Sequence, residues 1–455
     1  MVSLGVLLYA FFGLAKIALW IWVAGPTSYT WVSLLSANTI EALAWTIWIL
    51  VRYGRSNGPA LAVFPLVCSL YASVPVALLS ADLQVFPFSA AVVWNGMVMQ
   101  SVMATHVWVL TCSAHSKASI ANYQSRLNSW IDRLPVTWVG IWIFLLIGLA
   151  IACFCLTNFY LSGASALIGN DSRLELTVRV ETGKLWLLQY AFECWLIICG
   201  IVWASKRARS ALTKPQLMTA MTCFLIFIYP YLQIGNRREL MTWFVFCCVL
   251  LFMRGRHKTI SFLATITIPA FLYLGLVREN SQGASLVATD PLSFYLNLLG
   301  EFVFPHFPLL DRLSAPHHLW MGWSYLRLPA FVVPTFGLWH RPASLAIIFA
   351  QRYSGGSMGY AYTPLGEGFA NFGALSVIIV PLVLVAGGRF LASRHLHSPI
   401  PFLIFLAFAL EINRGEFISI TLEFAVFVVI TSTLVRILNF RLVKEKCLAQ
   451  GQHGA

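Results

Sequence analysis

The amino-acid sequence predicts an all-α, polytopic integral membrane protein with a single transmembrane domain, residues 1–455, and three observations lead to this fold class. The composition is 59% hydrophobic and only 10% charged, with a mean hydropathy of +0.78. That balance is too apolar for a soluble globule. Apolar segments that suit a bilayer recur along the chain. The inner loops that join them gather basic residues, whereas the short outer loops 25–30 and 81–89 hold no lysine or arginine, as the positive-inside rule expects.

Twelve apolar segments are the predicted spans. The first lacks the basic start and the small-residue cleavage site of a signal peptide, so we interpret it as a retained span. The predicted spans are residues 4–24, 31–51, 60–80, 90–112, 137–157, 185–204, 216–234, 239–253, 259–277, 366–388, 400–411 and 417–435.

The loop charges predict the orientation of the chain. With the N-terminus in the cytoplasm, the inner loops hold more than half of the 30 lysines and arginines, whereas the outer loops 25–30 and 81–89 hold none. An even number of spans places both termini in the cytoplasm and makes residues 436–455 a cytoplasmic tail. We expect the inner basic residues to orient the chain and to contact anionic lipid head groups, and we expect no nucleic-acid partner.

Lys16 and Glu41 fall near the middle of the first two spans, which run antiparallel, so they are predicted to pair. An ion pair at that depth has either a structural role or a role in proton transfer, and the second would favour a transporter. The ten cysteines, by contrast, avoid the outer loops and show no spacing typical of a zinc site. We therefore expect neither a disulfide framework nor a bound metal.

Two predicted spans, 239–253 and 400–411, are shorter than the roughly 20 residues that cross the hydrocarbon. The polar turns beside them are therefore expected to lie below the membrane surface, where irregular backbone must line a wet cavity or be buried in protein. These turns hold Arg237, Arg238 and Arg414. An arginine at such depth costs about 2.5–3.5 kcal/mol, which calls for a compensating carboxylate or anion. Glu239, Glu411 and Glu416 are the candidate carboxylates, and phosphate is the anion that the planar guanidinium fits best.

The predicted outer loop, residues 278–365, is rich in aromatic and leucine residues, so we expect amphipathic or re-entrant helices at the outer interface. The loop leads into the most informative segment of the chain, 363–373, with the sequence TPLGEGFANFG. A carboxylate, an amide and several glycine or proline residues open a membrane-spanning run there. Polar groups at that depth usually line a cavity or a site.

Together with the turn 235–239, Tyr325, the stretch 334–342, the stretch 349–359 and the turn at Arg414, this segment resembles the Wzy-type O-antigen polymerases, also called oligosaccharide repeat unit polymerases. The resemblance covers mainly residues 235–435. The paired R-x10-G motifs of some members are not matched, because the positions eleven residues beyond Arg341 and Arg352 hold Arg352 and Thr363. A mechanism built on those motifs is therefore not carried over.

The resemblance implies a GT-C-like fold and a location in the bacterial inner membrane. It implies that glycan carried on undecaprenyl diphosphate is transferred to the next lipid-linked repeat unit on the periplasmic side, so that the lipid diphosphate leaves. The implied partners are these lipid-linked glycans, membrane lipids, a chain-length regulator and a flippase. No cofactor is expected, because the P-loop, dinucleotide-binding and H-E-x-x-H motifs are not found.

Such a transfer needs cations for the leaving diphosphate and a base for the acceptor hydroxyl. The predicted diphosphate ligands are Arg237, Arg238, Arg278 and Arg414. The predicted base is Glu367, followed by His317, His318 and Glu301. The predicted glycan contacts are Arg341, Arg352, Tyr353, Tyr362 and Asn371.

Alternatives stay open for these assignments. Glu367 has an alternative role as an acceptor of backbone N–H groups at its helix start. Each outer arginine has an alternative role as a side chain that snorkels to the membrane interface. For the whole protein, the alternatives are an O-antigen ligase, which uses the same donor, and a polysaccharide flippase or secondary transporter.

Overall fold

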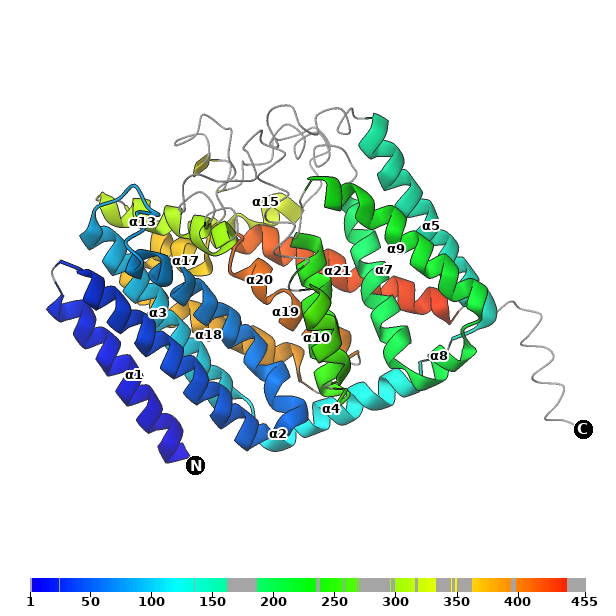
Figure 1. Cartoon of the computed structure of the whole chain (residues 1–455), viewed down its shortest axis with the longest axis horizontal. Coiled ribbons are helices and arrows are strands. Elements are labelled where there is room, and N and C mark those ends of the chain that lie inside the picture. The colour runs from blue at the N-terminus through cyan, green and yellow to red at the C-terminus, as the bar shows by residue number, and fades with distance from the viewer. Residues whose placement is uncertain are drawn as a thin grey trace, which may run out of the picture. The chain divides into compact units, whose positions relative to one another are not determined.

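The computed structural model is all-helical over the residues that it describes, with no strand among them (Figure 1). The described residues are 2–161 except 24 and 135, 186–234, 238–269 except 257 and 268, 295, 299–315, 318–332, 345, 348–349, 362–393 and 398–439. This result confirms the predicted class of an all-α membrane protein.

Six helices among the described residues are long and apolar enough to cross a membrane. They are Ser28–Gly54, Asn57–Ser80, Ala90–Ala114, Trp138–Thr157, Pro364–Leu391 and Phe417–Leu438. Three shorter apolar helices are Leu7–Trp22, Tyr190–Ala204 and Met241–Met253. Each of these nine helices coincides with a predicted span. The total of twelve spans and the GT-C-like arrangement stay predictions.

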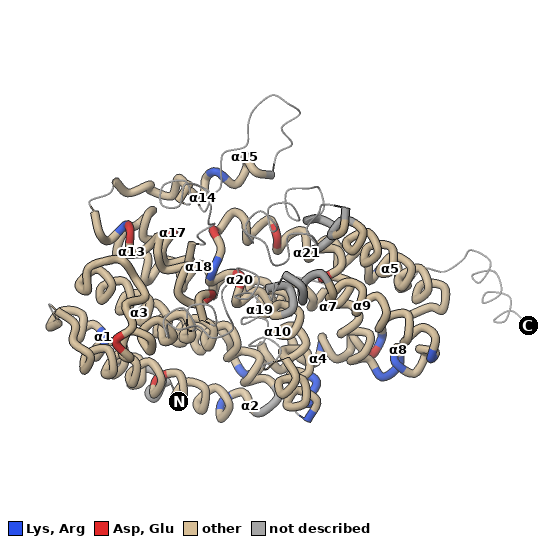
Figure 2. Tube along the Cα trace, turned by 45° about the horizontal axis from the view of Figure 1, so that its top comes forward, with Lys and Arg blue, Asp and Glu red and all other residues tan. Residues whose placement is uncertain are grey.

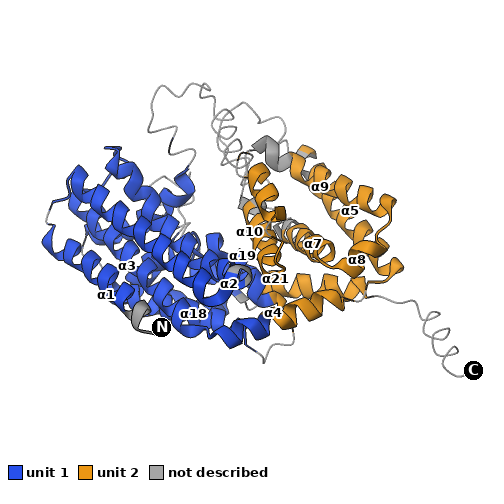
Figure 3. Cartoon of the chain, turned by 60° about the horizontal axis from the view of Figure 1, so that its bottom comes forward, with its two compact units in different colours: residues 1–123, 288–397, 401–424 blue, residues 124–287, 398–400, 425–455 orange. Residues whose placement is uncertain are grey.

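The chain divides into two compact units, which are coloured separately in Figure 3. Unit 1 comprises residues 1–123, 288–397 and 401–424, and unit 2 comprises residues 124–287, 398–400 and 425–455.

Unit 1 is built on four helices, α1, α2, α3 and α18, and α3 packs against each of the other three. Gly54, with φ 81° and ψ 170°, interrupts α2 and separates two spans. Side chains from both α2 spans share one apolar core with α3, where Trp31 and Trp94 meet edge to face at 5.0 Å between ring centroids. The four helices are α1 (Val2–Trp22), α2 (Ser28–Ser80), α3 (Ala90–Ala114) and α18 (Ser376–Leu391).

The rest of unit 1 includes short helices. They are η2 (Phe304–His306), α13 (Phe307–Ser314), α14 (Trp323–Leu326), α15 (Leu328–Val332), α17 (Pro364–Phe372), η3 (Gly373–Leu375), α20 (Ala409–Ile412) and, apart from its first residue, α19 (Ile400–Ala407). Helices α4 (Lys117–Asp132) and α21 (Phe417–Leu438) each begin in unit 1 and continue into unit 2.

The predicted pair of Lys16 and Glu41 is confirmed, and it lies in a buried network that joins α1, α2 and α3. The Lys16 ammonium also donates to Thr105 Oγ1 at 3.1 Å and to the Ser101 carbonyl at 3.3 Å, which uses its three N–H groups. Glu41 accepts further bonds from Thr105 Oγ1 at 3.0 Å and from Trp45 Nε1 at 3.3 Å. Both charges are therefore compensated by short-range contacts, which favours the structural role for this pair.

Unit 2 is a bundle in which α5 packs against α7 and α9, and α10 packs against α7. Trp195 of α7 stacks on Phe144 of α5 with 5.2 Å between ring centroids, and its Nε1 donates to the Phe144 carbonyl at 3.0 Å. The helices are α5 (Trp138–Leu161), α7 (Trp186–Ala204), α8 (Lys206–Ala211), α9 (Lys214–Ile234) and α10 (Arg238–Met253). Figure 2 shows charged residues at the ends of several of these helices and few along their lengths.

Candidate functional site

The segment 363–373 forms a short helix because its sequence carries a start signal and a stop signal. Thr363 caps α17, since its Oγ1 accepts the Gly366 N–H at 3.0 Å, and Pro364 occupies the first helical position. Gly373 ends the helix with φ 60° and ψ −143°, a conformation that residues with a Cβ rarely adopt. The chain then enters α18. Glu367 lies in the first turn of α17, within the span Pro364–Leu391.

Gly368 allows α17 to fold tightly onto α18. A Cβ at this position would lie 2.5 Å from a methyl group of Val380 and 3.0 Å from Cβ of Ser376. Such contacts are far shorter than real side chains allow, so a larger residue would push the two helices apart. The glycine therefore serves close packing beside Glu367.

The loop that precedes α14 binds the end of α17. The Trp320 and Met321 N–H groups donate to the carbonyls of Ala370 and Asn371 at 2.9 and 3.1 Å. These bonds satisfy acceptors that the last turn of a helix leaves without intrahelical partners. Helix α14 follows this loop and brings Ser324 against α17.

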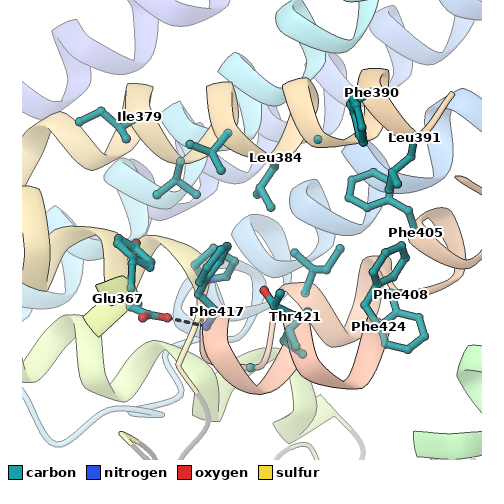
Figure 4. A pocket seen from close by; sticks show the side chains of 18 of the residues that line it. Glu367, Ile379, Leu384, Phe390, Leu391, Phe405, Phe408, Phe417, Thr421 and Phe424 are labelled. Carbon is teal, nitrogen blue, oxygen red and sulfur yellow. Dashed lines mark hydrogen bonds between the residues drawn. The ribbon is translucent and has the colours of Figure 1, made fainter. Parts of the chain in front are cut away.

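Ser324 and the start of α21 hold the Glu367 carboxylate. Ser324 Oγ donates to Oε1 and the Phe417 N–H donates to Oε2, each at 2.6 Å. Figure 4 shows the bond from the Phe417 N–H. The Phe417 N–H opens helix α21, where the positive end of the helix dipole stabilises a carboxylate. Glu367 is 1% exposed. Its two oxygens still have lone pairs for another donor, because an ionised carboxylate accepts about four hydrogen bonds.

Asn371 completes this arrangement from within α17. Its Nδ2 donates to Ser324 Oγ at 2.7 Å and to the Glu367 carbonyl at 2.8 Å, and its Oδ1 accepts the Ser324 N–H at 3.4 Å. Asn371 is fully buried. We therefore assign it to holding Ser324 and Glu367 in place, rather than to the predicted contact with glycan.

A second buried carboxylate lies one residue before α21. Glu416 accepts the Leu345 N–H at 2.6 Å and the Ser419 hydroxyl at 2.7 Å. Glu416 and Glu367 thus have the same kinds of partner, one backbone N–H and one serine hydroxyl. They differ in position, because Glu367 lines a cavity whose lining does not include Glu416.

Arg414 lies in the turn between α20 and α21, bound to two carboxylates. Its Nη1 is 2.6 Å from Glu301 Oε2, and its Nε is 4.0 Å from Glu411 Oε2. The predicted compensation by Glu411 is therefore found, and Glu301 is a closer partner. The Arg414 side chain is 23% exposed, so part of the guanidinium is accessible.

The cavity has a volume of about 460 Å³. Glu367 and Tyr325 are among its lining residues, and the rest of its wall is almost entirely apolar. Figure 4 shows Glu367 and Phe417 near one end and Phe390, Leu391 and Phe405 near the other. The cavity is partly open to the surface, and its lining residues Val383 and Phe390 are 54% and 62% exposed. An elongated apolar cavity with a carboxylate at one end suits an amphiphile with a hydrocarbon chain.

The remaining predicted site residues are distributed as follows. His318 is exposed, and Tyr362 is buried in an apolar cluster with Leu345 and Phe349, where burial raises the pKa of Tyr362 to about 12. Arg238 is the first residue of α10, in unit 2. Six predicted residues lie outside the described part of the chain: Arg237, Arg278, His317, Arg341, Arg352 and Tyr353.

Ser324 was missed by the sequence reasoning, since no motif marks it. No group of three or more His, Cys, Asp or Glu side chains among the described residues is placed to hold a metal ion. The fold and site thus define a helical membrane protein with a buried, hydrogen-bonded carboxylate beside an apolar cavity. In comparisons with known proteins, no family model, curated protein or solved structure matches the chain.

Proposed function

We propose that this protein is a glycosyltransferase that polymerises lipid-linked oligosaccharide repeat units into O-antigen or a related surface polysaccharide. The observation that carries the proposal is the Glu367 carboxylate at the end of an apolar cavity between membrane helices. A lipid-linked sugar needs both features, an apolar slot for its chain and a polar group at the reacting end. The sequence resemblance to Wzy-type polymerases supplies the donor, a glycan on undecaprenyl diphosphate.

In the proposed reaction, a hydroxyl group of the incoming repeat unit attacks the anomeric carbon of the donor. A new C–O bond forms there, and the bond from that carbon to the phosphate oxygen breaks. Glu367 takes the hydroxyl proton, and undecaprenyl diphosphate leaves with the electron pair. One direct displacement of this kind inverts the anomeric centre. The reaction requires no metal as written.

Arg414 is the proposed cation for the leaving diphosphate. A guanidinium has five N–H donors in a planar fork, so it can bind phosphate oxygens while it keeps a bond to Glu301. A preorganised cation stabilises phosphate charge as it develops in the transition state. The partly exposed position of Arg414 is compatible with this role.

Ser324 and Asn371 act as positioning residues in this proposal. Their bonds hold one Glu367 oxygen, and the Phe417 N–H holds the other. The carboxylate is thereby kept in one orientation at the cavity wall. A base that is held in this way loses little conformational freedom when the substrate binds.

The experiment compares Glu367→Gln with Glu416→Gln. Glutamine keeps the local bonds at position 367, because its oxygen accepts the Phe417 N–H and its NH₂ group donates to Ser324 Oγ, but it cannot take a proton. We expect Glu367→Gln to fold normally and to lower the rate of polymer formation about 10²- to 10⁴-fold, the usual contribution of a general base. Glu416→Gln is the matched control, since it changes a buried carboxylate with the same kinds of partner, and it should keep most of the rate.

The assay uses purified full-length enzyme with lipid-linked repeat units extracted from the cells that produce it, and products are separated by gel electrophoresis. Polymer made by Glu367→Gln at the parental rate would remove Glu367 as the base. A parental enzyme that extends no repeat unit but moves glycan onto lipid A-core would instead identify a ligase. Movement of intact lipid-linked units across liposome membranes would identify a flippase.

A further inference from the structure

A basic cluster in unit 2 gathers where two apolar helices end. These are the apolar helices Tyr190–Ala204 and Met241–Met253, and α8 begins two residues after the end of the first. Basic residues follow within two positions, Lys206 after the first helix and Arg254 after the second. Figure 2 shows charged residues at α8 and at the neighbouring helix ends. The cluster consists of Lys206, Arg209, Arg254 and Arg256, with Asp132 of α4 among them.

Gly255 determines where Arg256 lies. Gly255 has φ +68°, and its N–H donates to the Phe252 carbonyl, while the Arg256 N–H reaches back to the Leu251 carbonyl, each at 2.9 Å. This pair of bonds is a Schellman motif, which ends α10 and turns the chain back. The Arg256 guanidinium then lies 5.9 Å from the ring centroid of Trp203, close to the end of α7.

Arg254 has a structural task in the same place. Its two terminal nitrogens donate to the two Asp132 oxygens at 2.8 and 3.1 Å, and it also bonds Asn128 and the Ala204 carbonyl at 3.2 and 3.4 Å. It thereby joins α4, α7 and α10. The hydrogen bond from Arg254 lowers the pKa of Asp132, so this carboxylate is ionised at neutral pH.

Asp132 neutralises only one of the four basic charges, that of Arg254, with which it is paired. Burial lowers the pKa of Arg256, and the nearby charges of Arg209 and Arg254 lower it further. Arg209 and Arg256 thus lie close enough to repel each other beside the pair, and Lys206 lies near Asp132 at the same helix ends. An anion between them would remove that repulsion.

We propose that Lys206, Arg209 and Arg256 form a binding site for the phosphate of an anionic phospholipid. Two features favour a lipid over a soluble phosphate. The site borders the ends of apolar helices, and Trp203, which is 40% exposed, lies beside it in the position typical of a ring at the membrane interface. The acyl chains of the lipid pack along α7 and α10. This site is independent of the proposed transferase reaction.

The test measures lipid-dependent stability of the purified full-length protein in a neutral detergent. Phosphatidylglycerol is titrated into the micelles, with phosphatidylcholine and inorganic phosphate as parallel arms, and the thermal midpoint is followed. A ligand that binds only the folded state raises the midpoint in a concentration-dependent way. We expect phosphatidylglycerol to raise it, while phosphatidylcholine and inorganic phosphate leave it unchanged.

The decisive variants are Arg209→Gln and Arg256→Gln. Each should weaken the apparent affinity for phosphatidylglycerol about fivefold, the size expected for one basic residue at an anionic membrane surface. Arg436→Gln removes one exposed basic charge at the end of α21 and is the matched control, so it should have no effect. The Arg254–Asp132 pair is left intact in all three variants, which preserves the fold.

Three outcomes would overturn the proposal. One is an equal rise of the midpoint with phosphatidylcholine, because that result means a general lipid effect. Another is the same rise with inorganic phosphate, which means an anion site without lipid. The third is an equal loss of affinity in Arg436→Gln, which means a response to net charge alone.

Discussion

The buried pair of Lys16 and Glu41 allows a double-mutant cycle whose size follows from the contacts. In Glu41→Leu, the Lys16 ammonium loses its charged partner at 1% exposure and keeps only Thr105 Oγ1 and the Ser101 carbonyl as acceptors. Removing one partner of such a buried pair costs about 3–5 kcal/mol in the free energy of unfolding. Lys16→Met leaves the Glu41 carboxylate uncompensated and should cost a similar amount.

The double variant Lys16→Met/Glu41→Leu should be far more stable than either single variant, because no buried charge is left. The Thr105 hydroxyl, which has lost Glu41 as an acceptor, can donate to the Ser101 carbonyl 3.1 Å away. Trp45 Nε1 loses its acceptor, which costs about 1–3 kcal/mol for a buried donor. We therefore expect the double variant to lie within about 3 kcal/mol of the parent.

The assay is an unfolding titration of the purified proteins in mixed micelles, together with polymer formation per folded molecule. If the pair has a structural role, the effects of the two substitutions on the free energy of unfolding should be strongly coupled. The double variant should then form polymer at the parental rate. Additive losses would contradict the energetic reasoning. A double variant that folds but makes no polymer would contradict the structural role and point to proton transfer through the pair.

Three further predictions concern the cavity, the cation and the topology. Gly387 lines the cavity with no atom within 4 Å of an added Cβ, so Gly387→Leu should fill the cavity and weaken binding of an undecaprenyl-linked donor at least tenfold. The control Ala386→Leu changes an exposed residue of α18 that does not line the cavity, and it should leave binding unchanged. Equal binding by both variants would exclude the cavity as the site of the lipid chain. Arg414→Ala should abolish polymer without loss of protein from the membrane, and Arg414→Lys should restore only part of it, because lysine has no bidentate fork. Normal polymer in the alanine variant would remove the diphosphate role. Reporter fusions after Ser210 and Ser314 should report cytoplasm and periplasm, respectively, and a periplasmic signal at Ser210 would overturn the span assignment.

The sequence by itself determined the class of the fold, because crossing a hydrocarbon layer demands long apolar helices with few charges. Their approximate positions follow from local composition, as the nine matching helices show. It also determined that Glu367 lies at a helix start, since the Thr363 cap, Pro364 and Gly373 act within a few residues of one another. Even the pair of Lys16 and Glu41 was predictable, because two antiparallel spans bring equal depths together.

Only the tertiary structure decided what Glu367 and Arg414 touch. Ser324 is 43 residues from Glu367 and the Phe417 N–H is 50 residues away, and neither carries a sequence signal. Glu301, the nearest carboxylate to Arg414, comes from a segment far earlier in the chain. Such pairs depend on how helices pack and on how closely Gly368 lets α17 approach α18. Local sequence preferences act over a single helical turn or strand, so they carry no information about which distant side chain completes a buried site.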